Sequence, residues 1–218
     1  MLKMKVFNRL IIVLFIGLSC KTTKKKENER LPFFNSAELT PEWISKEDAN
    51  YKSIHKIPNF EFINQEGNRV TQENFENKIY VADFFFTTCP GICPMLEKNM
   101  SKLQEVFKND SEIKLLSHTV TPIKDSVSVL KEYAKENEII TSKWNLVTGN
   151  KEHIYNIARN GYFADEDFVK TGDKDAFIHT ENFVLVDKEK RIRGVYNGTL
   201  AIEVERLIKH INILKKEY

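Results

Sequence analysis

Apolar positions recur along this chain with two different periods, which predict strands and helices in turn. The most apolar internal stretch, residues 79–86, is eight residues long and rich in β-branched and aromatic side chains. It is too short for a membrane span, which needs about 20 residues, and its composition is typical of a buried central strand. A second stretch of the same character, residues 113–120, predicts another buried strand.

Helical spacing follows each of these two strands and recurs near the end of the chain. Beyond Pro94, four apolar residues fall on one helix face: Leu96, Met100, Leu103 and Phe107. Proline is favourable in the first turn because its missing N–H has no intrahelical partner there. Three further helices are predicted, one around Leu130, one capped by Asn150 and one over residues 204–214.

Shorter segments complete a set of elements typical of an α/β fold. A strand over residues 60–63, a turn at 66–68 and a return strand at Val70 predict a β-hairpin ahead of the first buried strand. Another strand is expected over 144–147 and a second hairpin over 182–196. Strands that alternate with helices and end in a hairpin and a helix predict an α/β domain, with a central mixed sheet flanked by helices.

The first twenty residues have the order of an export signal. Three basic residues come first: Lys3, Lys5 and Arg9. An apolar run over 10–18, too short to cross a membrane, is followed by a serine and Cys20, an arrangement that resembles a bacterial lipoprotein signal. We predict that residues 1–19 are removed and that lipid on Cys20 anchors the chain on the periplasmic or other extracytoplasmic face of a membrane. An uncleaved anchor with an incidental cysteine is the alternative, since Gly17 stands where leucine is usual.

Composition and charge narrow the domain organisation and the partners. The 218 residues are 41% apolar, which suffices for one domain with a core. Removal of 1–19 takes away three positive charges, so the formal net charge of +2 becomes −1, and nothing suggests nucleic-acid binding. Residues 20–57 open with a polar, lysine-rich stretch, and we expect a lipidated tether and a partly ordered arm there, followed by the domain over 58–218.

Two cysteines, Cys89 and Cys93, stand where the first buried strand gives way to a helix. A disulfide between residues so close in sequence restrains little chain, so a chemical role is the better interpretation. Unpaired amides and the dipole at a helix N-terminus favour the thiolate. Two thiolates four positions apart can bind each other, as a reversible disulfide, or a soft metal ion such as Cu(I). A structural zinc site would want four ligands, and no fourth is evident.

A histidine is the natural further ligand, and the chain has five. We expect His153 and His210 to be solvated, His55 in the arm to be uninformative, and His118 to be a satisfied core residue. His179 differs because it follows an irregular acidic segment and precedes a strand, which places it on a loop at one end of the sheet. An imidazole there would complete a three-ligand copper site that accepts Cu(II) as well as Cu(I). Spacing alone leaves open whether His179 is a ligand or an ordinary loop residue.

The segment FFFTTCPGICPML, residues 84–96, closely resembles the copper-site motif of the Sco/SenC family. Similarity runs from about Pro58 to the C-terminus and includes TVTPIKDSVSVLKEYA, WNLVTG and FVLVDKEKRIRGVYNG. This family comprises thioredoxin-fold copper chaperones that help to assemble the dinuclear copper site of cytochrome c oxidase. The resemblance implies a thioredoxin-like fold and copper binding by Cys89, Cys93 and His179. The implied partners are a copper donor, a thiol reductant, and a copper-receiving oxidase subunit or another copper enzyme.

Two positions depart from the family pattern. Thr121 and Ile178 stand where the family often has aspartate. Metal-bound histidines usually need a hydrogen-bond acceptor behind them, so the departures leave the ligands intact but bear on copper affinity and on the oxidase as client. Asp125 matches a second family aspartate and is expected to cap a helix, while Asp173 or Asp175 can replace the missing acceptor.

We therefore expect a membrane-tethered copper chaperone rather than an enzyme. The alternative is a thiol-disulfide oxidoreductase that reduces the metal-binding cysteines of a client, which needs Cys89 and Cys93 but not His179. Thiol peroxidase activity is disfavoured because no arginine adjoins the cysteine loop. A thioredoxin-like module with an inert disulfide does not account for the export signal and His179 together.

Overall fold

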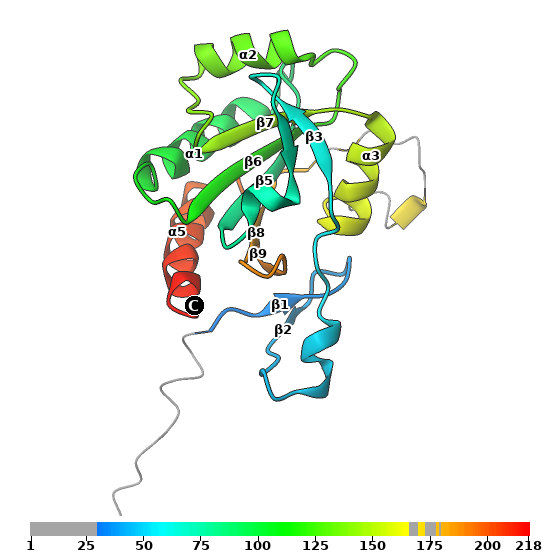
Figure 1. Ribbon diagram of the computed structural model, residues 1–218, viewed down its shortest axis with the longest axis vertical. Coiled ribbons are helices and arrows are strands. Elements are labelled where there is room, and N and C mark those ends of the chain that lie inside the picture. The colour runs from blue at the N-terminus through cyan, green and yellow to red at the C-terminus, as the bar shows by residue number, and fades with distance from the viewer. Residues whose placement is uncertain (1–29, 166–169, 173–177, 179) are drawn as a thin grey trace, which may run out of the picture.

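The computed structural model describes residues 30–165, 170–172, 178 and 180–218. Within them, a seven-stranded sheet has the order β4-β3-β7-β6-β5-β8-β9 (Figure 1). Its strands are β3 (Glu61–Asn64), β4 (Arg69–Thr71), β5 (Ile79–Phe85), β6 (Ile113–Thr119), β7 (Trp144–Thr148), β8 (Asn182–Val186) and β9 (Ile192–Asn197). The helices are α1 (Cys93–Val106), α2 (Val127–Glu136), α3 (Lys151–Asn156) and α5 (Ala201–Lys215).

The sheet is mixed, as predicted. β6 pairs parallel to both β5 and β7, whereas every other pairing in the sheet is antiparallel. All seven residues of β5 are buried because the strand is central and covered on both faces. The expected α/β fold is confirmed.

Two hydrophobic cores lie on opposite faces of the sheet. Alternate β5 side chains enter each core, with Val81 and Phe85 on one face and Tyr80 and Phe84 on the other. Residues of α1, α2 and α5 pack on the first face, and α3 with the turn that follows it packs on the second. The cysteine pair belongs to the first core.

Several local predictions are confirmed. The lead-in hairpin is β3 and β4, followed by the 3-10 turn η4 (Gln72–Phe75), and the Asn150 side chain caps α3 by accepting from the His153 amide. The helix that Asn150 caps changes after Asn156 to a π-helical turn, η5 (Ile157–Gly161). There the Tyr162 amide bonds the Ile157 carbonyl at 2.9 Å, one residue further back than in an α-helix.

The described residues of the N-terminal arm pack against the domain. The sequence patterns did not indicate how this arm would pack. It contains a small hairpin, β1 (Phe33–Phe34) and β2 (Pro41–Glu42), and a 3-10 turn, η3 (Ala49–Ser53). Leu31 and Phe33 are buried, and the arm lies beside the C-terminus of α5 (Figure 1). The Leu31 amide donates to the Glu217 carboxylate at 2.9 Å, which joins the beginning and end of the described chain.

Arg193 makes the central contacts of this junction. Its guanidinium donates to the Leu31 carbonyl at 2.6 Å and the Pro32 carbonyl at 3.0 Å. It also bonds the carboxylates of Glu217 at 2.7 Å and Asp187 at 3.3 Å. Burial of this charge is tolerated because each of the three guanidinium nitrogens donates a hydrogen bond to an acceptor.

We predict that Arg193→Ala lowers the free energy of unfolding by about 3–5 kcal/mol, since removing one member of a buried ionic cluster leaves its partners without compensation. Denaturant unfolding of the variant measures the loss. Arg69→Ala, which removes an exposed ion pair with Glu61, should leave stability nearly unchanged. Equal stability of the two variants would show that the arm junction contributes nothing.

Candidate metal centre

The two cysteines lie beyond the carboxyl end of β5, Cys89 in the loop that leads into α1 and Cys93 at the start of that helix. β5 ends at Phe85, and Cys93 is the first residue of α1 rather than part of the loop before it. Cys89 and Cys93 are 9% and 6% exposed, and both are free thiols. The Cys89 amide donates to the Phe86 carbonyl at 3.3 Å, which turns the chain back toward the helix.

The N-terminus of α1 acts on the two sulfurs in opposite directions. Ile92 caps the helix without any side-chain hydrogen bond, so the first amides have no capping oxygen. Burial works against the Cys89 thiolate, yet the Cys93 thiol and the amides of Cys93, Gly91 and Ile92 donate to the Cys89 sulfur. These donors together hold the pKa of Cys89 below its ordinary value.

Cys93 has the opposite shift. Burial raises the pKa of its thiol to about 12, and its role as donor to Cys89 reinforces the change. Cys89 is therefore the sulfur that ionises more readily, and Cys93 is the one that keeps its proton. One exchange-ready thiolate beside a protonated partner suits both disulfide exchange and capture of a soft metal ion.

A buried carboxylate fixes the loop to the neighbouring strand. Asp125 is fully buried and accepts from the Thr87 hydroxyl at 2.6 Å, the Thr87 amide at 3.3 Å and the Thr121 hydroxyl at 2.9 Å. It also accepts from the Thr119 hydroxyl. The expectation that Asp125 caps α2 is wrong, because Ser126 is the capping residue and its hydroxyl accepts from the Val129 amide.

Thr121 has a structural role in this network. Its hydroxyl is one of the Asp125 donors, so threonine here supplies a hydrogen bond that aspartate would replace with charge repulsion. Ile178, the other departure from the family pattern, is buried in the core on the opposite face of the sheet. Aspartate at that position would need a partner for a buried charge.

Asp83 is a site residue that the sequence interpretation passed over. It is the one charged residue of β5, and it lies on the strand between Val81 and Phe85, whose side chains enter the core that holds the cysteines. Burial raises the pKa of Asp83 to about 7 despite a hydrogen bond from Ser117. The interruption of an apolar strand by one carboxylate was the available sequence signal, and its charge contributes to raising the pKa of Cys93.

Four of the five histidines are described, and none joins the cysteines. His118 is fully buried and stacks on Phe84, as expected for a core residue, but neither ring nitrogen has a hydrogen-bond partner among the described residues. Burial lowers its pKa to about 3. The other three, which are half-buried, bond Gly161 (His55), stack on Phe62 (His153) or bond Tyr196 (His210).

His179 and Cys20 lie outside the described residues. The strand register shows at which end of the sheet β8 begins. Val184 pairs antiparallel with Ala82, and the first residue of β8 is two positions before Val184. That strand start therefore faces the end of β5 from which the cysteine loop departs. Within the described part of the chain, no group of three or more His, Cys, Asp or Glu residues is placed to hold a metal ion.

We predict that Cys89 is alkylated faster than Cys93 in the reduced, metal-free protein at neutral to mildly alkaline pH, because only the thiolate reacts. Mass spectrometry of each cysteine peptide gives the two rates. Cys93→Ala should slow Cys89 at neutral pH, since loss of the donating thiol raises the Cys89 pKa. Equal rates in the wild type would contradict the assigned proton distribution.

We also predict that Thr87→Val destabilises the protein by about 1.5 kcal/mol, the low end for a hydrogen bond to a charged group, because Thr87 is half-buried. It should also accelerate thiol modification by loosening the loop. Thr88→Val is the matched control, since Thr88 is the exposed neighbour. Unfolding and alkylation measured on both variants check this, and identical behaviour would remove Asp125 as the anchor of the loop.

Comparison with known proteins agrees with this arrangement. The family model described as SCO1/SenC matches residues 48–215. A curated relative, "SCO1 protein homolog" of Bacillus subtilis, is 30% identical over 169 residues, which cover 76% of this chain and 84% of the relative.

Two solved structures extend the comparison. A SCO1/SenC family lipoprotein from Bacillus anthracis has a TM-score of 0.64 and 27% identity, covering 79% of this chain and 99% of that one. Arabidopsis thaliana ScoI, solved with copper bound, has a TM-score of 0.55 and 26% identity, covering 74% of this chain and 98% of the other. The fold is thus that of the Sco proteins, and copper is the metal of the family. The chain belongs to the SCO1/SenC family.

Proposed function

We propose that this protein carries copper on Cys89, Cys93 and His179 and delivers it to a copper enzyme. The proposed receiving site is the dinuclear copper site of cytochrome c oxidase. The observation that carries the proposal is the buried pair of free thiols at the start of α1, one favoured as thiolate by helix amides. β8 begins at the end of the sheet where the cysteine loop lies, and His179 precedes β8 in the sequence. Its relatives include a structure solved with copper bound.

The donor set suits copper as a transferable cargo. Two thiolates satisfy Cu(I), and an imidazole adds a ligand that Cu(II) also accepts. Binding requires the Cys93 proton to leave, so copper affinity should fall with decreasing pH. Because that proton returns when the ion leaves, the raised pKa of Cys93 favours release to a stronger site.

Membrane attachment through lipid on Cys20 is part of the proposal. No helix within the described ranges is long and apolar enough to cross a bilayer. The similar Bacillus anthracis structure is of a lipoprotein, which supports a lipid anchor on this chain. The anchored domain then lies on the extracytoplasmic face, where a copper-receiving enzyme presents its metal site.

A second candidate function is reduction of a disulfide in the copper-receiving protein. The observation that favours it is the hydrogen bond from the Cys93 thiol to the Cys89 sulfur, which favours ionisation of Cys89. The Cys89 thiolate would attack one sulfur of a client disulfide, which breaks the client S–S bond, forms a mixed disulfide and releases the other client cysteine as a thiolate. Cys93 would then displace the client thiolate and close the Cys89–Cys93 disulfide, and the two electrons would come from this pair. A thiol reductant would restore the reduced protein.

We predict that His179→Ala weakens copper binding at least about tenfold and removes the Cu(II) complex more completely than the Cu(I) complex, because the thiolates still serve Cu(I). Competition titrations with Cu(I) and Cu(II) chelators measure both affinities. His153→Ala, at a half-buried histidine away from the cysteines, is the control. Unchanged binding of both ions by His179→Ala would refute the ligand assignment and leave the thiol-disulfide function as the better candidate.

A further inference from the structure

The sheet has two functionally different ends. β8 runs antiparallel to β5, so that Val186 pairs with Tyr80 at the beginning of β5. The turn from β8 to β9 therefore lies at the end of the sheet opposite the cysteine loop. Seven residues of β5 separate the two ends by about 20 Å. The arm hairpin β1–β2 packs at the end away from the cysteines, next to the C-terminus (Figure 1).

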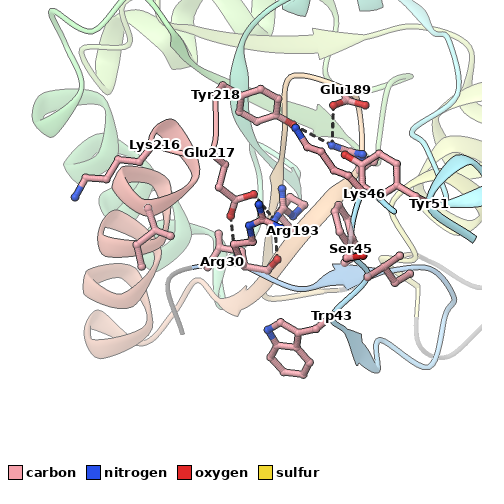
Figure 2. A pocket seen from close by; sticks show the side chains of 15 residues that line it. Arg30, Trp43, Ser45, Lys46, Tyr51, Glu189, Arg193, Lys216, Glu217 and Tyr218 are labelled. Carbon is pink, nitrogen blue, oxygen red and sulfur yellow. Dashed lines mark hydrogen bonds and ion pairs between the residues drawn. The ribbon is translucent and has the colours of Figure 1, made fainter. Parts of the chain in front are cut away.

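An unusual surface faces outward at this far end. Trp43 is 67% exposed, whereas Trp144, the other tryptophan of the chain, is 2% exposed. Trp43 borders a hollow of about 670 Å³ between the arm and the end of α5, and Figure 2 shows its ring apart from the bonded cluster around Arg193. The exposed cations Arg30, Lys46 and Lys216 also line the hollow.

Two acidic residues line the hollow and both are paired, while Glu47 lies nearby, its pKa lowered by a Ser45 hydrogen bond and also by the charges of Arg30 and Lys46. The acidic residues among the described lining, Glu189 and Glu217, bond Arg191 at 3.0 Å and Arg193 at 2.7 Å. The same bonds occupy the two buried arginines, which further contact Asp187. The hollow therefore offers no free guanidinium in its floor for a small anion, and its rim combines an exposed indole with three cations.

We infer that this surface, defined by Trp43, Arg30, Lys46 and Lys216 and here called the arm face, lies against the lipid bilayer to which the chain is tethered. An indole has an apolar body with one N–H and is favoured at the boundary between hydrocarbon and headgroups. Lysine and arginine beside it meet the phosphates of anionic lipids. The inference rests on the lipid anchor of the proposed function.

The tether between Cys20 and Arg30 is short enough to keep the arm face within reach of the bilayer. Cys20 precedes Arg30 by ten residues, which span at most about 35 Å when fully extended. The residues between them include Lys21, Lys24, Lys25 and Lys26, whose charge draws the segment toward an anionic surface. The arm face is where the described chain begins, so it is the part of the domain held nearest the anchor.

Contact through the arm face would orient the whole domain. Arg193 bonds the Leu31 and Pro32 carbonyls, and Leu31 bonds Glu217, so the arm is fixed to β9 and to the end of α5. A bilayer against the arm face would leave the cysteine end directed away from the membrane by at least the length of β5. Copper would then be presented to a partner that projects outward from the same bilayer.

Tryptophan fluorescence tests this directly, since Trp43 and Trp144 are the only two indoles. The full-length lipidated protein is reconstituted into phosphatidylcholine–phosphatidylglycerol vesicles that contain brominated lipids. We expect quenching and a blue shift in the wild type and none in Trp43→Phe, whose remaining indole is buried. Arg30→Glu combined with Lys46→Glu and Lys216→Glu should reduce the quenching while the protein still co-floats with vesicles.

A matched probe at the other end supplies the control. Ile202 is 73% exposed at the start of α5, which follows the β9 end paired with Asn182 and therefore lies at the cysteine end. Ile202→Trp in the Trp43→Phe background should show no quenching. Equal quenching at the two positions, or none at Trp43 in protein that co-floats, would overturn the inference while leaving the lipid anchor standing.

Two further experiments distinguish the remaining outcomes. If wild-type protein does not co-float, the anchor has failed, and Cys20→Ser carrying an N-terminal histidine tag on nickel-chelating lipid tests the arm face independently of it. Quenching of Trp43 in that protein supports the arm face, and its absence refutes it. Burial of Trp43 by a second copy would appear as a concentration-dependent mass and blue shift without lipid, and this result would also refute the inference.

Discussion

The buried carboxylate of Asp125 is the constraint on which the cysteine site depends. It accepts hydrogen bonds from the hydroxyls of Thr87, Thr119 and Thr121, and so joins the chain just beyond β5 to the end of β6. Parallel neighbouring strands end at the same edge of the sheet, but nothing in their ladder fixes the chain beyond that edge. A buried charge that needs several donors supplies this restraint, because every donor that moves away leaves it less compensated.

With the loop fixed, two thiols in similar surroundings acquire different chemistry. Cys89 receives hydrogen bonds from the amides of Gly91, Ile92 and Cys93, at and just before the N-terminus of α1, while burial dominates the shift of Cys93. The same backbone path therefore produces one sulfur that ionises readily and, four residues away, one that holds its proton. Copper carriage and disulfide exchange both use this asymmetry, and the ligand contributed from outside the loop is what distinguishes them chemically.

Patterns that act over short sequence distances could be predicted from the sequence. The buried strands, the capping by Asn150 and the lead-in hairpin follow from local periodicity and turn residues, and the cysteine loop follows from a strand that meets a helix. The role of Asp125 cannot be predicted locally, because its donor Thr87 is 38 residues away. The packing of the arm cannot be predicted either, because Arg193 bonds carbonyls 161 and 162 residues earlier, a pairing that no sequence period encodes.

The two ends of the sheet are built by different means, and this separates attachment from chemistry. The cysteine end is held by short-range turns and one carboxylate, whereas the arm end is held by a buried arginine cluster that links remote segments. The arm is joined to β9 and to the end of α5, and β9 is joined to β5 through β8 by backbone ladders. The cysteine loop and the arm junction therefore rest on separate sets of hydrogen bonds, so that a substitution in one set removes no bond of the other.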